Sequence, residues 1–289
     1  MKGSGESLFY QRVVNPEKIQ AIKYRIEERN IKERTSQHLK NVRRVICEAP
    51  CQNQFEQLWY ALKDSRIFQE HYRFAQYKYD DVDGNVNLIA GSEVGEELYR
   101  DIMSKDSQLV LLRAKIQGNL EKIQLQYNSS RQIEKDGSVR VSLGWLLHDL
   151  VLMIETQLYL MKSTLDLYAT FTQFFFPPSE HSLPGQMGDQ IKYFTKPEAM
   201  RTDIEYGGYL SGKMDWFYRL KALRDAITHF GSLMLIMEET PNNQTEIFFY
   251  PRRSHVLESR VPFSNIEDIV KDYLSFQVFY KSHFLKVIG

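Results

Sequence analysis

Cysteine is scarce in this chain of 289 residues, which has only Cys47 and Cys51, in the segment "CEAPC". Their spacing differs from the Cys-x-x-Cys spacing of redox motifs, and no second cysteine pair would complete a four-ligand zinc site. We therefore expect two reduced thiols that form no metal site and have no redox function. Free thiols are usual in a reducing compartment, so the cysteine content favours a cytoplasmic location.

An excess of charge of one sign is also missing, because Lys plus Arg and Asp plus Glu both number 37. A formal net charge of zero gives no global electrostatic reason to expect a nucleic acid or an acidic membrane as partner. A local basic groove is still compatible with this balance. The net charge therefore neither supports nor excludes RNA as a substrate.

Long hydrophobic runs free of charge are absent as well. The N-terminal segment "MKGSGESLFYQRVV" lacks the apolar core of a signal peptide. The most apolar segment, residues 145–176, is interrupted by His148, Asp149, Glu155, Lys162 and Asp166. Polar and charged residues at this frequency favour a buried helix over a membrane span, so we expect no membrane partner.

Several common cofactor and metal motifs are missing too, among them a glycine-rich phosphate loop, His-Glu-x-x-His and Gly-x-Ser-x-Gly. The acidic segment "YKYDDVDGNVNLIAG" does not match a calcium loop. With Gly84 at the sixth position of an EF-hand, Tyr79 and Ala90 would occupy the first and twelfth positions, where carboxylates are needed. We therefore expect no cofactor and no metal.

The first part of the chain reads as helical. Helix-forming residues without Gly or internal Pro predict one helix over residues 16–46 and a second over 53–76. Asp-Gly between β-prone runs then predicts a turn or small hairpin within residues 77–91. Residues 1–92 are accordingly expected to be an N-terminal helical extension.

The rest of the chain, residues 93–289, contains four further helical segments, and we expect an all-α fold built on a four-helix bundle. The segments are residues 93–127, 141–176, 215–230 and 265–287. The long connection over 177–213 is rich in Pro and Gly and is expected to be functional, to be mobile or to carry short elements. Residues 232–251 predict a β-hairpin insertion. The last helix opens with "SNIE", a capping box in which Ser264 and Glu267 would satisfy each other's backbone donors.

The segment "LRDAITHFG", residues 223–231, carries the strongest indication of function. Around it Trp216, Leu220, Leu223, Ile227 and Phe230 recur at steps of four, three, four and three, which predicts a buried seam on one helix. The face opposite that seam then carries Tyr218, Lys221, Arg224, Asp225, Thr228 and His229. Gly231 is placed to end the helix, which puts His229 in the last turn.

The positions of three polar residues on that face suggest a composite site. Asp225 lies four residues before His229, so its carboxylate could orient or charge the imidazole. Arg224 and His229 are separated by about 140° around the helix and about 7.5 Å along it, too far for one helix to place both easily on a single phosphate. Two helices related by a two-fold axis could instead line one cleft with both pairs, and Ala222 and Ala226 would allow close approach.

The same residues also allow a simpler interpretation, because polar residues on an outward helix face are usually only solvated. Arginine followed five residues later by histidine is a weak pattern on its own. It recurs at Arg66 and His71 in "RIFQEH", which we interpret as ordinary surface residues.

In its context, "LRDAITHFG" resembles the signature of the HEPN superfamily, in which an arginine, a polar residue and a histidine lie near the end of the third bundle helix. The resemblance covers residues 93–289 and matches Arg224, Asp225 and His229, with Asp225 in place of the more common asparagine. It implies a homodimeric, metal-independent endoribonuclease, often part of a toxin–antitoxin or defence system, so an antitoxin protein is a candidate partner.

Two further interpretations remain open beside a ribonuclease. One is a non-catalytic HEPN-like dimerisation or binding module, which the neutral net charge favours. The other is a purely structural helical protein. In the ribonuclease, His229 of two chains would be the acid and base, Arg224 would hold the phosphate and Asp225 would orient its neighbours.

Overall fold

The computed structural model describes residues 50–80, 86–133, 139–178, 183–196, 203–239, 245–251 and 260–289. The predicted helix over residues 16–46, Cys47, the side chain of Cys51 and the turns at 81–85 and 240–244 lie outside these residues. The chain divides into two compact units. Unit 1 contains the described residues up to 106 with 164–212 and 277–289, and unit 2 contains 107–163 and 213–276.

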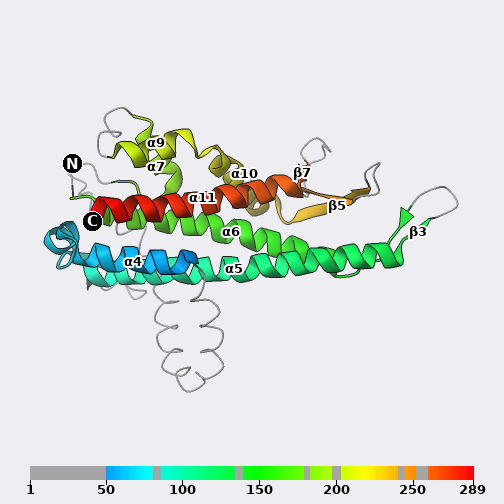
Figure 1. The fold of residues 1–289 in the computed structure, drawn as a ribbon, viewed down its shortest axis with the longest axis horizontal. Helices are drawn as coiled ribbons and strands as arrows, with labels where there is room; N and C mark the ends of the chain where they lie inside the picture. The colour runs from blue at the N-terminus through cyan, green and yellow to red at the C-terminus, as the bar shows by residue number, and fades with distance from the viewer. Residues whose placement is uncertain are drawn as a thin grey trace, which may run out of the picture. The chain divides into compact units, whose positions relative to one another are not determined.

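Unit 1 is almost entirely helical (Figure 1). Its complete elements are α4 (Pro50–Asp64), the π-helix η2 (Phe68–Tyr72), the antiparallel strands β1 (Gln76–Asp80) and β2 (Val86–Ala90), the 3₁₀ turn η3 (Gln173–Phe175), α7 (Met187–Phe194) and α9 (Ile204–Gly212). Three long helices contribute residues to both units: α5 (Gly91–Ser130), α6 (Leu146–Thr172) and α11 (Phe263–Ile288). The predicted boundary at residue 92 lies at the start of α5 and stays a prediction.

Unit 2 contains the remaining elements, including the three-stranded sheet. They are the short strands β3 (Gln132–Ile133) and β4 (Val139–Arg140), helix α10 (Asp215–Phe230), and the strands β5 (Leu233–Glu239), β6 (Thr245–Pro251) and β7 (Val261–Pro262). β5 and β6 pair antiparallel from Leu233 opposite Pro251 to Glu239 opposite Thr245, which confirms the predicted hairpin. β7 adds a third strand on β6.

The mainly helical fold with small antiparallel strand pairs agrees with the predicted class. The predicted helix over 53–76 is too long, because α4 ends at Asp64 and η2 begins at Phe68. Ser65 lies between them, and its Oγ accepts a hydrogen bond from the backbone N–H of Phe68 at 3.2 Å. Such a local side-chain bond competes with the regular helix ladder. None of the described helices is both long and apolar enough to cross a membrane.

Aromatic rings dominate the core of unit 1. Phe55 and Trp59 of α4 lie against Phe171 of α6, with ring centroids 5.4 and 5.9 Å apart. Trp59 also stacks on Tyr99 of α5 at 5.8 Å, and its Nε1–H donates to Glu96 at 2.8 Å. This close packing depends on a glycine: a Cβ on Gly95 would lie 2.7 Å from the indole of Trp59.

We expect Gly95→Ala to lower the free energy of unfolding by about 1–3 kcal/mol, because the added methyl group overpacks a buried aromatic contact. Gly118 is the matched control, since it lies in the same helix and a Cβ added there would meet no described atom within 4 Å. Gly118→Ala should raise stability by about 0.5–1 kcal/mol through helix propensity. Urea denaturation measures both, and equal effects of the two substitutions would contradict the packing argument.

Side-chain contacts link four helical segments of unit 2 in pairs. The side chain of Asn119 on α5 donates to the carbonyl of Leu146 at the start of α6. Lys162 of α6 lies over the ring of Phe217 of α10, and Trp216 of α10 packs edge-on against Tyr273 of α11. α5, α6 and α11 together line a cavity. Helix α10, which carries the predicted site, is thus held by α6 on one side and α11 on the other.

Candidate functional site

Helix α10 has the two faces that its sequence predicts. Trp216, Leu220, Leu223 and Ile227 are buried, so the 4-3-4 spacing marks the core side of the helix as expected. The opposite face, which we call the α10 polar face, consists of Tyr218, Lys221, Arg224, Asp225, Thr228 and His229. Four of these side chains are exposed, and Arg224 and Asp225 are half-buried.

The structure brings Arg224 and Asp225 together but leaves His229 apart. Arg224 Nη1 lies 3.0 Å from Asp225 Oδ1, and Lys221 Nζ lies 3.4 Å from Asp225 Oδ2. Both carboxylate oxygens therefore face cations. The expected contact between Asp225 and His229 is not formed, and His229 makes no hydrogen bond or ion pair with any residue that the structure describes. The ion pairs with two neighbouring cations outcompete the imidazole for this carboxylate.

Arg224 has unused hydrogen-bonding capacity. Its side chain is 26% exposed, and its Nε is buried without an acceptor among the described residues. A buried donor without an acceptor costs about 1–3 kcal/mol, so an added acceptor at this position is favourable. An anion that reaches the exposed part of the guanidinium would compete with Asp225 for the charge.

Two residues of α6 hold α10 in place, although the sequence pattern did not identify them as part of the site. The hydroxyl of Tyr159 is hydrogen-bonded to Thr228 Oγ1 at 2.7 Å. Glu155 Oε1 accepts from the backbone N–H of Leu233 at 2.6 Å and from Ser232 Oγ at 2.8 Å, just beyond the end of α10. The sequence shows Glu155 only as a charge inside an apolar run, so its partners, about 78 positions away, could not be predicted from the pattern.

Gly231 ends α10 as expected. Its backbone has φ 92° and ψ −173°, and its N–H donates to the carbonyl of Ile227 at 3.1 Å. This combination lies in a region that only glycine adopts without strain. The turn places His229 in the last helical turn.

We expect Gly231→Ala to lower the free energy of unfolding by about 1–3 kcal/mol, because a Cβ is strained at this φ and ψ. Gly212 is the control, since it ends α9, has no positive φ and faces open space. Gly212→Ala should change stability far less. Chemical denaturation of both variants checks the prediction, and a neutral Gly231→Ala would mean that the end of α10 adapts without cost.

The second arginine–histidine pair stays on the surface as predicted. Arg66 pairs with Glu70 at 2.6 Å, and His71 is exposed in the π-helix. The hydrogen bond with Glu70 and the charge of that carboxylate raise the pKa of Arg66. This pair provides a control of identical spacing for experiments on Arg224 and His229.

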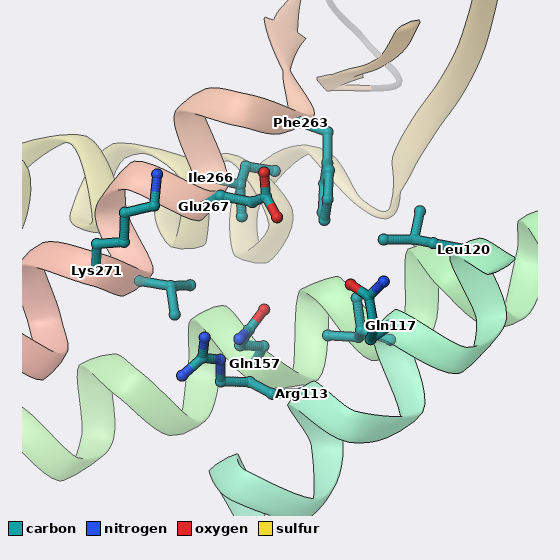
Figure 2. Close-up of a pocket in the computed structure, with 10 residues that line it drawn as sticks. Arg113, Gln117, Leu120, Gln157, Phe263, Ile266, Glu267 and Lys271 are labelled. Carbon is teal, nitrogen blue, oxygen red and sulfur yellow. The ribbon is translucent and has the colours of Figure 1, made fainter. Parts of the chain in front are cut away.

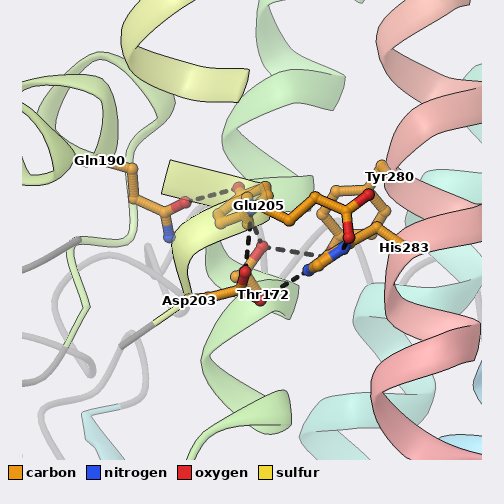
Figure 3. Close-up of polar contacts among 7 residues, drawn as sticks. Thr172, Gln190, Asp203, Glu205, Tyr280 and His283 are labelled. Carbon is orange, nitrogen blue, oxygen red and sulfur yellow. Dashed lines mark hydrogen bonds and ion pairs between the residues drawn. The ribbon is translucent and has the colours of Figure 1, made fainter. Parts of the chain in front are cut away.

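A different cluster of titratable side chains is buried in unit 1 (Figure 3). His283 Nε2–H donates to Asp203 Oδ2 at 2.6 Å, and His283 Nδ1 lies 3.3 Å from Glu205 Oε2. The imidazole also stacks between Phe279 and Tyr206, with ring centroids 5.5 and 6.2 Å away. The side chains of His283 and Asp203 are only 5% and 9% exposed, so this ion pair is shielded from water.

Each member of this pair stabilises the charge of the other. Burial alone would raise the pKa of Asp203, but hydrogen bonds from His283 and from the N–H of Tyr206, with the charge of His283, lower it. Burial alone would lower the pKa of His283, but its hydrogen bond with Asp203 and the charges of Asp203 and Glu205 raise it. The sequence offered no signal for this cluster, because its members are about 80 positions apart.

Neither a protein-family model nor a curated protein matches this chain, and no solved structure does. Within the described ranges, no three His, Cys, Asp or Glu side chains are grouped so that they could hold a metal ion. Function is therefore inferred from the chain's own residues and from the resemblance of "LRDAITHFG" to the HEPN signature.

Proposed function

We propose that this protein is a metal-independent endoribonuclease of the HEPN type, with a four-helix bundle and an active site built on the α10 polar face. One observation carries the proposal: Arg224 and His229 lie on the face opposite the buried seam, where His229 has no partner among the described residues. A histidine and an arginine kept accessible in this way are suited to general acid–base chemistry and to phosphate binding.

In the proposed reaction one histidine accepts the proton of the ribose 2′-hydroxyl, whose oxygen attacks the adjacent phosphorus. The bond to the 5′-oxygen breaks, and a second histidine donates a proton to that leaving oxygen. Arg224 binds the charge that accumulates on the phosphoryl oxygens. The products carry a 2′,3′-cyclic phosphate and a 5′-hydroxyl. Asp225 holds the guanidinium of Arg224, in place of the orienting contact to His229 that its spacing suggested.

A second copy of the chain would supply the second histidine. An apolar stripe on and just before α6 supports this homodimer, because Trp145, Leu152 and Tyr159 recur every seven residues and are 79%, 46% and 40% exposed. Seven residues return a helix to nearly the same side, so Leu152 and Tyr159 share one face of α6, and Trp145 lies one residue before the helix begins. The hydroxyl of Tyr159 contacts Thr228, which joins the stripe to the α10 polar face.

The resemblance to HEPN proteins further suggests a cytoplasmic toxin–antitoxin or defence system with an antitoxin protein as partner. The alternative is a non-catalytic HEPN-like module. The ion pair between Arg224 and Asp225 favours it, because a guanidinium that already faces a carboxylate binds phosphate less readily.

The decisive experiment incubates the purified full chain with a mixed RNA pool in EDTA, beside the double variant Arg224→Ala/His229→Ala. We expect cleavage by the wild type only, with cyclic phosphate and 5′-hydroxyl ends. Equal cleavage by both proteins would mark a contaminating nuclease and remove the proposal. No cleavage by the wild type on any RNA would leave the non-catalytic module as the better description.

The homodimer is tested separately by light scattering at micromolar concentration. We expect a dimer for the wild type and a monomer for Leu152→Asp, because a charge in the apolar stripe opposes its burial. Val110→Asp is the control, since Val110 is 53% exposed on α5 outside the stripe. A wild-type monomer would exclude a site composed from two chains.

A further inference from the structure

A cavity of about 340 Å³ lies within unit 2, between α5, α6 and the first turns of α11 (Figure 2). None of its lining residues belongs to the α10 polar face. Its volume lies at the lower end of the range of roughly 300–1,000 Å³ that small-molecule pockets occupy. The walls combine five apolar side chains with five polar or charged ones.

Gln157 on α6 is the most informative residue of this cavity. It is only 4% exposed, yet its amide makes no hydrogen bond with any residue in the part of the chain that the structure describes. Figure 2 shows the amide directed into the cavity. The amide atoms stay open to the space of the cavity, where water or a polar group of a ligand can satisfy them. Gln157 therefore offers both a donor and an acceptor to a ligand that enters the cavity.

Two charged side chains of opposite sign also face this space. Arg113 extends from α5, and Glu267 extends from α11 on the opposite wall. Within the described ranges neither makes an ion pair or a hydrogen bond. Glu267 therefore does not close the capping box that the sequence predicts with Ser264, and its carboxylate is available. Lys271 is also at the rim, but its Nζ pairs with Asp268 at 3.1 Å.

We propose that this cavity binds a free α-amino acid with a large apolar side chain. The α-carboxylate would pair with Arg113 and the α-ammonium with Glu267. The amide of Gln157 can accept from the ammonium and donate to the carboxylate, so it complements both groups. The apolar side chain would lie against Phe263 and Ile116, which are among the apolar residues that line the walls.

This ligand class follows from the balance of the available groups. A cation and an anion that have no ion-pair partner among the described residues match a ligand with both charges, whereas a simple anion would be repelled by the carboxylate of Glu267. The buried apolar wall favours Leu or Phe over a small or charged amino acid, because burial of apolar area supplies the non-polar part of the affinity. Binding of such a ligand does not depend on the proposed ribonuclease activity.

The test titrates L-leucine and L-phenylalanine into the full chain in a calorimeter. L-leucinamide, which lacks the carboxylate, and N-acetyl-L-leucine, which lacks the ammonium, are the matched ligands. We expect saturable binding of at least one amino acid, weakened about tenfold or more in each modified ligand, because each loses a charge-assisted hydrogen bond. Equal binding of N-acetyl-L-leucine would indicate only an anion site and overturn the proposal, as would no saturable binding at millimolar concentration.

Variants of the lining residues test the location. Gln157→Leu should weaken binding about tenfold or more, because it removes the amide that complements both charged groups of the ligand, and circular dichroism checks that the variant is folded. Arg113→Gln should weaken binding similarly. Lys115→Gln, an exposed residue of α5 outside the cavity, is the charge-matched control and should bind normally. Unchanged affinity in both Gln157→Leu and Arg113→Gln would place any binding elsewhere and overturn the assignment.

Discussion

Replacing His229 with alanine is expected to lower the rate of RNA cleavage by about two to four orders of magnitude, the usual loss when a general acid or base is removed. The substitution should leave the fold intact, because His229 is exposed and makes no hydrogen bond or ion pair with the described residues. The measurement is the initial rate on a defined RNA in EDTA, with circular dichroism to compare the folds.

Arg224 offers a graded test of the same site. Arg224→Ala should lower the rate by about two to three orders of magnitude, the usual cost of removing a donor aimed at developing charge. Arg224→Lys keeps the charge but loses the planar fork, so we expect an intermediate loss. Asp225→Asn should have a smaller effect, because it retains an oxygen beside Arg224 but removes the charge of the ion pair.

The matched controls for these variants are Arg66→Ala and His71→Ala, which repeat the same spacing on an exposed segment of unit 1. Neither should change the rate. An equal loss in the control pair, or full activity in His229→Ala, would disconnect the α10 polar face from catalysis. Loss of activity in His229→Ala together with loss of secondary structure would instead show that His229 has a structural role.

The largest expected effect on stability belongs to the buried pair of Asp203 and His283 in unit 1. Asp203→Ala should lower the free energy of unfolding by about 3–5 kcal/mol, because it leaves the buried His283 with only the exposed Glu205 as counter-charge. Part of that loss, about 1 kcal/mol, comes from the helix cap. Asp203 Oδ1 accepts the backbone N–H of Tyr206 at 2.9 Å at the start of α9.

Asp203→Asn separates the two contributions, because asparagine is as good a cap as aspartate but carries no charge. It should therefore be less destabilising than Asp203→Ala. Asp272→Ala is the control for an exposed ion pair: Arg219 and Asp272 lie 3.5 Å apart with about half of each side chain exposed. Such pairs contribute about 0–1 kcal/mol. Urea denaturation gives all three values, and a loss in Asp203→Ala no larger than in Asp272→Ala would contradict a strong buried pair.

The pair should also make stability depend on pH. The pKa of Asp203 is lowered from 3.8, so its contribution is present above that value and is lost as the pH falls through the folded-state pKa. The pKa of His283 is raised from 6.5, so its contribution is complete below that value and is lost as the pH rises through the folded-state pKa. The pair therefore stabilises unit 1 most between these two ordinary values.

This pH dependence predicts how the stabilities of the wild type and of Asp203→Asn differ. The loss of unfolding free energy caused by Asp203→Asn should be larger at pH 5 than at pH 9, because the charge of His283 in the wild type is lost as the pH rises through its raised folded-state pKa. Denaturation curves at the two pH values measure the difference. A loss that is the same at both pH values, or larger at pH 9, would mean that the charges of this pair do not control stability.

Local periodicity predicted those elements whose pattern is long and regular. The bounds of α10 and its buried seam agree with the spacing of Trp216, Leu220, Leu223 and Ile227. Apolar residues that recur with a period of 3.6 can be buried on one side only if the segment is an α-helix. The hairpin of β5 and β6 was predicted from two apolar runs on either side of a turn sequence. The interruption of the helix at Ser65 could not be predicted, because a single side-chain hydrogen bond does not change the periodicity of the sequence.

The order of residues on one helix was determined by the sequence alone, so Arg224, Asp225 and His229 necessarily share the face opposite the seam. The folded structure decided which of them are in contact. There the carboxylate of Asp225 pairs with Lys221 and Arg224 and not with His229. The anchors Glu155 and Tyr159, the pair of Asp203 and His283, and the cavity around Gln157 all join residues distant in the chain. Only tertiary packing brings such residues together, because periodicity describes neighbours within one element and not the elements that pack against it.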